Sequence, residues 1–478
     1  MVQSACIIGG GPVGCALGTS LRSLGFDVDI YERYQDIRVV APPAGRSINL
    51  VLTNRGLRLA HDLGVKQELL KSTVRVSGRS MHPLEGEPVY QPYGRAGECN
   101  YSIDRSLLNK FWLSEAERRG CKIFFDHQAT EFEFKDGRVS FHHSDGRTTH
   151  LDLSRYDFVF GSDGGGSVIR GGLSRAGLIA STETLLSAGY KEVTFPAGSD
   201  GSYLMDPNSL HIWARNSHML MALANTDGSF TGTIFMERSS QGSDLPSFEK
   251  CCTNMEESEE FWTTYYPDAL KLTDEKKTIS NFVSSREGIL GTVRCSPWHC
   301  EIVTNRTVDL CLIGDAAHAI VPFFGQGVNC GFEDVYVLQQ LIRENKNDLR
   351  KALEVFGTLR KKDSDAIANL ALENYEEMRS KVADESFMFL KKLDAFIMNS
   401  FPRKYRTRYT MIMYSFNPYS VCEEMGRAML KFLSLVVEKF NLKPDADFTK
   451  EIDLPILENM IEVHISPVAN QLGVSFEF

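Results

Sequence analysis

The sequence predicts an α/β fold in which a Rossmann-type nucleotide-binding domain is combined with a β-sheet domain and a helical C-terminal region. Three observations carry this prediction. A strand, a glycine-rich turn, a helix and a second strand open the chain within residues 4–31. Alternating strands follow one another over residues 185–235, and a helical pattern dominates from residue 348 onward. These patterns indicate an α/β domain with two further parts.

The opening unit is a βαβ motif. Ser4–Ile8 is a short apolar run typical of a strand, Pro12–Leu24 is a predicted helix, and Val28–Tyr31 is a second strand. Further helices are predicted at Leu107–Arg119, Phe248–Thr264 and Gly327–Arg343, and further strands at Lys122–Phe125, Phe158–Phe160, Leu210–Trp213, Met219–Ala224, Thr231–Phe235 and Val308–Ile313. A polar linker at Asn441–Phe448 precedes a weakly patterned tail.

Composition limits the class of protein. The 478 residues are enough for two or three domains, and 42% hydrophobic with 24% charged residues is typical of a globular protein. The net charge of −10 argues against a nucleic-acid partner, which requires a basic face. No window offers the ~20 apolar residues that span a bilayer. The first strand begins by Ala5, so we expect no signal peptide.

The cysteines predict no metal site. All eleven are irregularly spaced and none forms a C-x-x-C pair, which fits a reducing compartment. Cys295, His299 and Cys300 lie close in sequence, but no second ligand pair follows them. Ordinary thiols are therefore favoured over metal ligands.

Gly9, Gly11 and Gly14 form a G-x-G-x-x-G turn between the first strand and helix. The first two glycines let backbone amides approach a pyrophosphate at the helix N-terminus, and the third lets helix and strand pack closely. Glu32, which follows the second strand, can accept hydrogen bonds from an adenosine ribose. The motif predicts a bound dinucleotide without separating NAD from FAD.

A second segment, Cys311–Asn329, specifies the dinucleotide further. Asp315 follows a strand and can accept hydrogen bonds from a polyol such as a ribityl chain. Gly325 and Gly327 open the next helix, so its free amides can face the pyrimidine edge of a flavin. Together with the first motif, this predicts FAD. For His318 we favour a packed helix-start residue over a catalytic one.

A third motif runs from Gly161 through Asp163 and Gly164 to Ser167 and Arg170, after an apolar strand. By itself it is also compatible with a turn that Ser167 caps. The three motifs together resemble the class A flavoprotein monooxygenases of the p-hydroxybenzoate hydroxylase type, whose FAD-binding domain is glutathione reductase-like. From residue 4 to about residue 420 the chain is similar to the kynurenine 3-monooxygenase family. The segments that carry this similarity are Gly45–Leu50, Gly78–Arg79, Gln91–Gly94, Ser102–Arg105, Leu210–Trp213, Val321–Gly327 and Leu372–Met378.

The resemblance implies a domain division and an activity. Residues 1–180 and 290–345 would form the FAD-binding domain, with residues 76–96 contributing to the substrate side. Residues 181–289 would form the β-sheet substrate domain and residues 346–478 the helical C-terminal region. The protein would hydroxylate L-kynurenine at ring position 3 with FAD, NADPH and O₂, through a C4a-hydroperoxyflavin. The sequence has no second G-x-G-x-x-G unit for NADPH, as expected of the class.

The resemblance also implies the site residues. Arg79 and Tyr93 match the family's arginine and tyrosine that hold the substrate carboxylate, and an arginine fork suits a carboxylate. The remaining substrate set is Asn374, Tyr409, Pro322, Phe323, Leu210, Met221 and Phe235. Arg46 and Arg105 match positions near the flavin, and Pro12, Val13, Arg33, Asp163, Val328 and Asn329 complete the cofactor set. No side chain is assigned as a catalytic acid or base.

Alternatives stay open on the sequence. One is a class A hydroxylase of another aromatic carboxylate, and another is a flavin-bearing interaction protein without turnover. A flavin-dependent halogenase is disfavoured because no W-x-W motif occurs. Residues 428–437 indicate an amphipathic helix, for which docking on the body is favoured over contact with a membrane surface. We expect a cytoplasmic protein, or mitochondrial outer-membrane association in a eukaryote, and the oligomeric state is left open.

Overall fold

The nucleotide-binding part is built on a six-stranded sheet. The computed structural model describes residues 2–40, 48–377 and 385–476. All neighbouring strands of this sheet are parallel, except at the antiparallel edge strand β18. The spatial order is β18 (His299–Val303), β19 (Thr307–Leu312), β12 (Phe158–Gly161), β1 (Ser4–Ile8), β2 (Asp27–Tyr31) and β8 (Lys122–Phe124). The predicted α/β fold class is confirmed.

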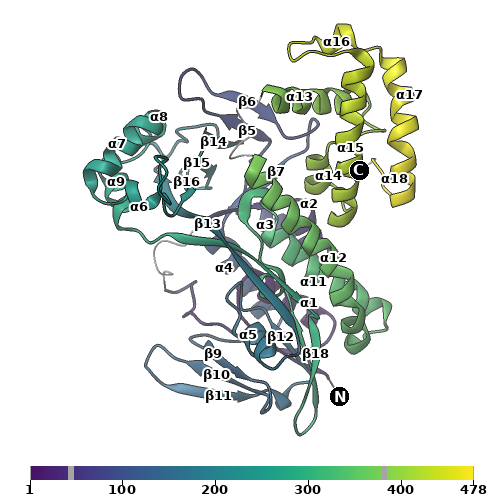
Figure 1. Cartoon of the computed structure of the whole chain (residues 1–478). Coiled ribbons are helices and arrows are strands. Elements are labelled where there is room, and N and C mark those ends of the chain that lie inside the picture. The colour runs from purple at the N-terminus through teal and green to yellow at the C-terminus, as the bar shows by residue number, and fades with distance from the viewer. Residues whose placement is uncertain (1, 41–47, 378–384, 477–478) are drawn as a thin grey trace.

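Helices cover this sheet and enclose the first hydrophobic core (Figure 1). α1 begins directly after the glycine turn and packs against α4 and α11. Proline suits its first position because that residue's N–H would have no intrahelical partner. The helices of this part are α1 (Pro12–Ser23), α2 (Asn54–Asp62), α3 (Lys66–Leu70), α4 (Arg105–Arg118), α5 (Val168–Arg175), α10 (Asp315–His318) and α11 (Gly327–Glu344). A 3₁₀ turn, η2 (Pro322–Phe324), precedes α11.

The structure contains a second sheet, of seven strands. Its strands, in spatial order, are β17 (Gly288–Ser296), β13 (Ala180–Phe195), β16 (Phe230–Glu237), β15 (His218–Ala224), β14 (Ser209–Arg215), β5 (Gly78–Met81) and β6 (Val89–Pro92). All neighbours are antiparallel except β14 and β5, which are parallel. The hairpin of β5 and β6 therefore joins this sheet, although it lies within the N-terminal part of the chain.

The two faces of the seven-stranded sheet pack into different cores, because successive side chains of a strand point to opposite faces. Trp213, Leu220 and Ile234 belong to a core that also contains residues of the helices after β16. Met219 and Phe235 belong to another core, shared with the C-terminal helices. The covering helices are α6 (Phe248–Cys251), α7 (Met255–Tyr265), α8 (Pro267–Leu270) and α9 (Glu275–Ser284). The single helix predicted at 248–264 is wrong, since Asn254 caps a new helix there by accepting from the Glu257 amide.

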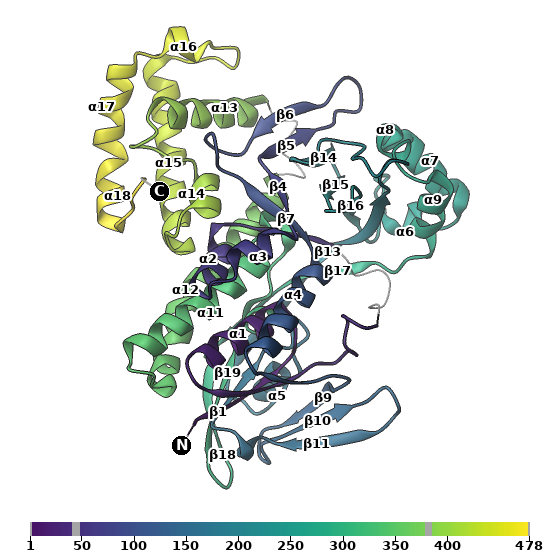
Figure 2. The same cartoon turned by 180° about the vertical axis from the view of Figure 1, so that it is seen from behind.

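Two small antiparallel sheets complete the strands. One consists of β9 (Gln128–Glu133), β10 (Arg138–His142) and β11 (Thr148–Asp152), which the sequence pattern did not predict. The other consists of β3 (Asn49–Leu52), β7 (Asn100–Asp104) and β4 (Val74–Val76). In both views β5 and β6 lie between the rest of the seven-stranded sheet and the C-terminal helices (Figure 2).

The C-terminal region is helical, as predicted. Its helices are α12 (Leu349–Glu376), α13 (Glu385–Ser400), α14 (Arg408–Tyr414), α15 (Tyr419–Phe440), α16 (Phe448–Glu451), α17 (Leu454–His464) and α18 (Ser466–Leu472). α15 buries Cys422, Met425, Met429 and Leu433 in the core shared with the seven-stranded sheet, which confirms a helix docked on the body. None of the helices formed by the described residues combines the length and apolar character needed to cross a bilayer.

Candidate active site

The glycine turn after β1 is closely packed. Gly9 has φ +111°, a conformation that favours glycine, and its amide donates to the Tyr31 carbonyl over 2.8 Å. A Cβ on Gly9 would lie 2.3 Å from the Ser162 carbonyl oxygen, and one on Gly14 would lie 2.1 Å from the Gly9 carbonyl oxygen. The turn therefore brings β1, α1 and the segment after β12 into backbone contact.

The space in front of α1 fits a dinucleotide. A Cβ on Gly11 would meet no protein atom within 4 Å, and no side chain caps α1. The open amides at the helix start suit a pyrophosphate. Glu32 accepts from the Gly10 amide over 2.8 Å and from the Tyr34 amide over 2.9 Å, which fixes its carboxylate beside the turn. Burial raises the pKa of Glu32 above its usual value.

The third motif joins this turn to the second segment. Asp163 accepts from the Ser167 hydroxyl over 2.5 Å and from the Val168 amide over 2.7 Å, so its carboxylate is used at the start of α5. Its backbone lies against Gly9. Arg170 donates to the Ala316 carbonyl over 3.0 Å and also pairs with Glu183. Arg170 therefore ties α5 to the loop that carries Asp315.

We call residues 314–327 the flavin loop. Gly314 has φ +62° and directly precedes α10, whose first residue is the exposed Asp315. Asn329 has all its side-chain groups engaged within the protein: its amide nitrogen donates to the Val51 and Gly325 carbonyls, over 2.7 and 2.9 Å, and its oxygen accepts from the Thr53 amide over 2.9 Å. The Asn329 side chain therefore positions the loop, and the flavin contact predicted for this residue stays a prediction that its backbone could fulfil.

His318 is packed, as predicted, although at the end of α10. Its Nε2 lies 2.5 Å from an Asp334 oxygen and its ring stacks on Trp298 with centroids 5.0 Å apart. His318, Cys330 and Asp334 offer atoms within 4.8 Å of one another. However, the Arg360 guanidinium lies 3.4 Å from the Cys330 sulfur and 2.8 Å from Asp334, and this fixed cation disfavours a metal ion. At the Cys295 and Cys300 positions, burial raises the thiol pKa values to about 11 and about 12, so both thiols are protonated at neutral pH.

On the substrate side, Arg79 and Leu210 are register partners across the parallel strands β5 and β14. The alternation along each strand places them on the face that faces the C-terminal helices. Met221 and Phe235 pack on the same face. Four predicted substrate residues from four strands therefore share one face of the seven-stranded sheet.

Arg79 lies beside two tyrosines. Its guanidinium carbon is 5.9 Å from the ring centroids of both Tyr93 and Tyr409, and the two rings stack 5.3 Å apart. The Nε of Arg79 is buried, and no hydrogen-bond partner is found for it among the described residues. Burial raises the pKa of Tyr93 to about 12, so its phenol is protonated at neutral pH and can donate. A guanidinium beside a phenol that can donate is an arrangement able to bind a carboxylate through charge-assisted hydrogen bonds.

An aromatic wall adjoins this group. The Phe323 ring lies 4.3 Å from that of Tyr375 and 5.1 Å from that of Phe235. The Asn374 amide donates to the Phe323 carbonyl over 2.6 Å, so α12 holds η2 in place. Phe324 stacks on Tyr409 with centroids 6.0 Å apart. The turn η2, with Pro322 half-buried at its start, therefore connects the group of Arg79, Tyr93 and Tyr409 to the aromatic wall.

The remaining predicted cofactor residues lie on several elements of the nucleotide-binding part. Arg33 and Arg105 are exposed, at the end of β2 and the start of α4. Val13 and Val328 pack against the first core at the starts of α1 and α11. Arg46 lies outside the described residues.

Sequence reasoning missed several residues of the substrate side. Asn100 is 2% exposed and its amide lies 3.5 Å from the Tyr409 hydroxyl. Its side-chain oxygen and the Tyr414 hydroxyl are buried, and neither has a partner among the described residues. Tyr375 and Phe324 contact Phe323 and Tyr409 as described above. No pattern in the sequence indicates Asn100, because it opens the mixed polar and apolar strand β7.

Known proteins resemble this chain in sequence and in fold. Residues 2–351 match the FAD binding domain family. The kynurenine 3-monooxygenase of Myxococcus xanthus is 37% identical over 454 residues, which cover 95% of this chain and 94% of that protein. The kynurenine 3-monooxygenase of Flavobacterium psychrophilum is 35% identical, covering 95% and 98%. A solved structure of 2-methyl-3-hydroxypyridine-5-carboxylic acid oxygenase superposes with a TM-score of 0.60 at 18% identity, over 80% of this chain and 94% of that one, which shows the same fold. The chain belongs to the kynurenine 3-monooxygenase family of FAD-binding proteins.

Proposed function

We propose that this protein hydroxylates L-kynurenine to 3-hydroxykynurenine with bound FAD, NADPH and O₂, as a step of tryptophan degradation. The observation that carries the proposal is the buried Arg79 Nε, for which no partner is found in the described part of the chain, on a guanidinium beside Tyr93 and Tyr409 next to the aromatic wall. A buried guanidinium nitrogen that has no hydrogen-bond partner in the protein is costly and favours an anionic ligand. A carboxylate at one end and an aromatic ring at the other match L-kynurenine.

In this proposal the chain's own residues bind the substrate, orient its ring and shield it from water. When bound, FAD takes electrons from NADPH and activates O₂. Arg79 would hold the substrate carboxylate by charge-assisted hydrogen bonds, and the protonated Tyr93 would donate a further one. The rings of Phe323 and Phe235 would flank the aminophenyl ring and exclude water, which favours hydroxylation over loss of oxygen as peroxide. The electron-rich ring demands no acid or base side chain.

Substrate-dependent turnover tests the proposal. The purified protein is mixed with FAD and NADPH, with and without L-kynurenine, and NADPH loss and 3-hydroxykynurenine are followed together. We expect L-kynurenine to accelerate NADPH oxidation and to yield about one product per NADPH. Acceleration without product would assign L-kynurenine as an effector only. No acceleration would favour another aromatic carboxylate or a protein without turnover.

Two glycine variants separate flavin binding from folding. In Gly11→Ala the new Cβ meets no protein atom within 4 Å, at φ −70°, so unfolding free energy should change by no more than about 0.5 kcal/mol. FAD affinity should nevertheless fall by about tenfold or more, because the methyl group enters the pyrophosphate space. Gly14→Ala is the contrasting variant, since its Cβ would lie 2.1 Å from the Gly9 carbonyl oxygen, and it should lose about 1–3 kcal/mol of stability. Unchanged FAD affinity in Gly11→Ala would place the pyrophosphate elsewhere.

A further inference from the structure

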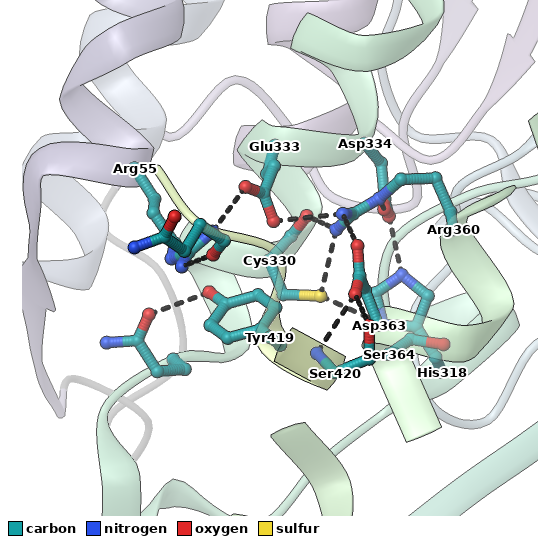
Figure 3. Close-up of polar contacts among 12 residues, drawn as sticks. Arg55, His318, Cys330, Glu333, Asp334, Arg360, Asp363, Ser364, Tyr419 and Ser420 are labelled. Carbon is teal, nitrogen blue, oxygen red and sulfur yellow. Dashed lines mark hydrogen bonds and ion pairs between the residues drawn. The ribbon is translucent and has the colours of Figure 1, made fainter. Parts of the chain in front are cut away.

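The flavin loop rests on a buried ionic network that the proposed reaction does not use. We define the buried network as Arg55, His318, Glu333, Asp334, Arg360 and Asp363 (Figure 3). Its members come from α2, α10, α11 and α12. A buried charge is stable only when paired, and this network holds three carboxylates against two guanidinium groups and one imidazole. It is electrically balanced when His318 is protonated.

Asp334 is the member that holds the flavin loop. One of its oxygens accepts from the Gly314 amide over 3.2 Å and lies 2.5 Å from His318 Nε2, while the other accepts from Arg360 Nε over 2.8 Å. Burial by itself would raise the pKa of Asp334, but His318 and Arg360 lower it below its usual value. Burial would lower the pKa of His318, but Asp334 raises it well above the usual value. One carboxylate therefore fixes both ends of α10.

The first turn of α15 reaches this network and the flavin loop from the C-terminal region. The Ser420 amide and hydroxyl donate to the same Asp363 oxygen, over 3.0 and 2.8 Å. The neighbouring Tyr419 hydroxyl donates to the Gln326 side-chain oxygen over 2.8 Å. The Arg55 guanidinium lies over the Tyr419 ring, 4.1 Å from its centroid. Figure 3 shows Tyr419 and Ser420 converging on the network from one side.

Gln326 is the point at which this contact acts on the flavin loop. It is fully buried and precedes the first turn of α11, between Gly325 with φ +62° and Gly327. The Gln326 side chain ties this turn to α15, while the Asn329 side chain holds it from within α11 through the Gly325 carbonyl. The Gln326 amide nitrogen lies 3.5 Å from the Phe324 carbonyl and 3.2 Å from the Met413 sulfur, both weaker partners than the Tyr419 hydroxyl.

We infer that Tyr419 is a positioning residue for the flavin, acting through Gln326 to hold the N-terminus of α11 toward the flavin ring. The C-terminal helical region is then part of the flavin site, and not only a cover over the substrate. The inference rests on the flavin-binding part of the proposed function and is independent of the substrate's identity. The amides at the start of a helix stabilise negative charge, so their position also affects how readily the bound flavin accepts electrons.

The test uses Tyr419→Phe in the full-length protein. FAD dissociation is measured by flavin fluorescence, and the midpoint potential of the bound flavin is measured at saturating FAD. We expect about tenfold weaker FAD binding, the loss expected when one buried hydrogen bond that orders the site is removed. We also expect a more negative midpoint potential, because α11 no longer presents its amides to the reduced flavin. Loss of packing elsewhere would not shift this potential.

Tyr405→Phe is the matched control. Tyr405 is also fully buried in the C-terminal region, and its hydroxyl donates to Asp394 over 2.7 Å. This variant should lose comparable thermal stability and keep FAD affinity and midpoint potential within experimental error. Equal effects of the two variants on the flavin would overturn the inference.

A double-mutant cycle tests the route. In a Gln326→Met background, Tyr419→Phe should cause little further change in FAD affinity, because their contact is already lost. If Tyr419→Phe fails to fold, Gln326→Met alone should show the same tenfold loss and the same direction of potential shift. Additive effects, or a Gln326→Met protein that binds FAD like the unmodified protein, would overturn the inference. Failure of the unmodified protein to bind FAD would instead count against the proposed function.

Discussion

Replacing Arg79 by Met is expected to weaken L-kynurenine binding by about 30-fold or more, which corresponds to at least ~2 kcal/mol. The reason is that the buried Nε of Arg79 has no partner among the described residues, while the guanidinium carbon lies 5.9 Å from the ring centroids of Tyr93 and Tyr409. Methionine keeps the length of the side chain and removes the charge. The dissociation constant is measured from the change in flavin absorbance on titration with L-kynurenine.

Arg75→Met is the control for this substitution. Arg75 lies in β4, is exposed, and donates to the Gly97 carbonyl over 3.3 Å. Removing the Arg75 charge should leave the dissociation constant for L-kynurenine within about twofold of that of the unmodified protein, as expected for exposed charges. FAD content should be unchanged in both variants. An Arg79→Met protein that binds L-kynurenine as the unmodified protein does would remove Arg79 from the substrate site.

The largest loss of stability is expected for Arg360→Met, at about 3–5 kcal/mol. Arg360 is 2% exposed and pairs with Asp334 over 2.8 Å and with Glu333 over 2.9 Å. Removing its charge leaves these carboxylates buried with fewer cations. Unfolding in urea, followed by far-UV circular dichroism, measures the difference in unfolding free energy.

An exposed ion pair provides the comparison. Arg343 pairs with Asp62 over 3.0 Å, and its side chain is 42% exposed. Arg343→Met should change the unfolding free energy by less than about 1 kcal/mol. Similar small losses in both variants would mean that water reaches the buried network and screens its charges.

The sequence predicted the parts of the fold that local patterns determine. The predicted bounds of the βαβ unit at residues 4–31 agree with the structure to within one residue at every end, because glycine spacing and apolar runs act over short distances. The pairing of Arg79 with Leu210 across β5 and β14 joins strands that are far apart in sequence. No periodic pattern indicates such a pairing. The strands β9–β11 were also missed, because they mix polar and apolar residues and show no clear alternation.

The candidate site shows the same division. Gly9, Gly14 and Glu32 were assigned from chemistry and spacing. In the structure the two glycines form one packed turn, and Glu32 accepts a hydrogen bond from its Gly10 amide. Arg79 was found only through family resemblance, because an isolated arginine in a short strand resembles a surface charge. The buried network was not predicted at all. Asp334 and Arg360 lie on long helices, where charged residues usually face solvent, and only the packing of α11 against α12 buries them.

The most direct test of kynurenine hydroxylation is to follow the oxygen atom itself. The purified protein is supplied with FAD, NADPH and L-kynurenine under oxygen-18 gas, and the product is analysed by mass spectrometry and by comparison with 3-hydroxykynurenine. We expect 3-hydroxykynurenine that carries one oxygen-18 atom on its ring, because a monooxygenase inserts one atom of O₂. Unlabelled product, or peroxide as the sole fate of the oxygen while L-kynurenine is recovered unchanged, would contradict the proposed function.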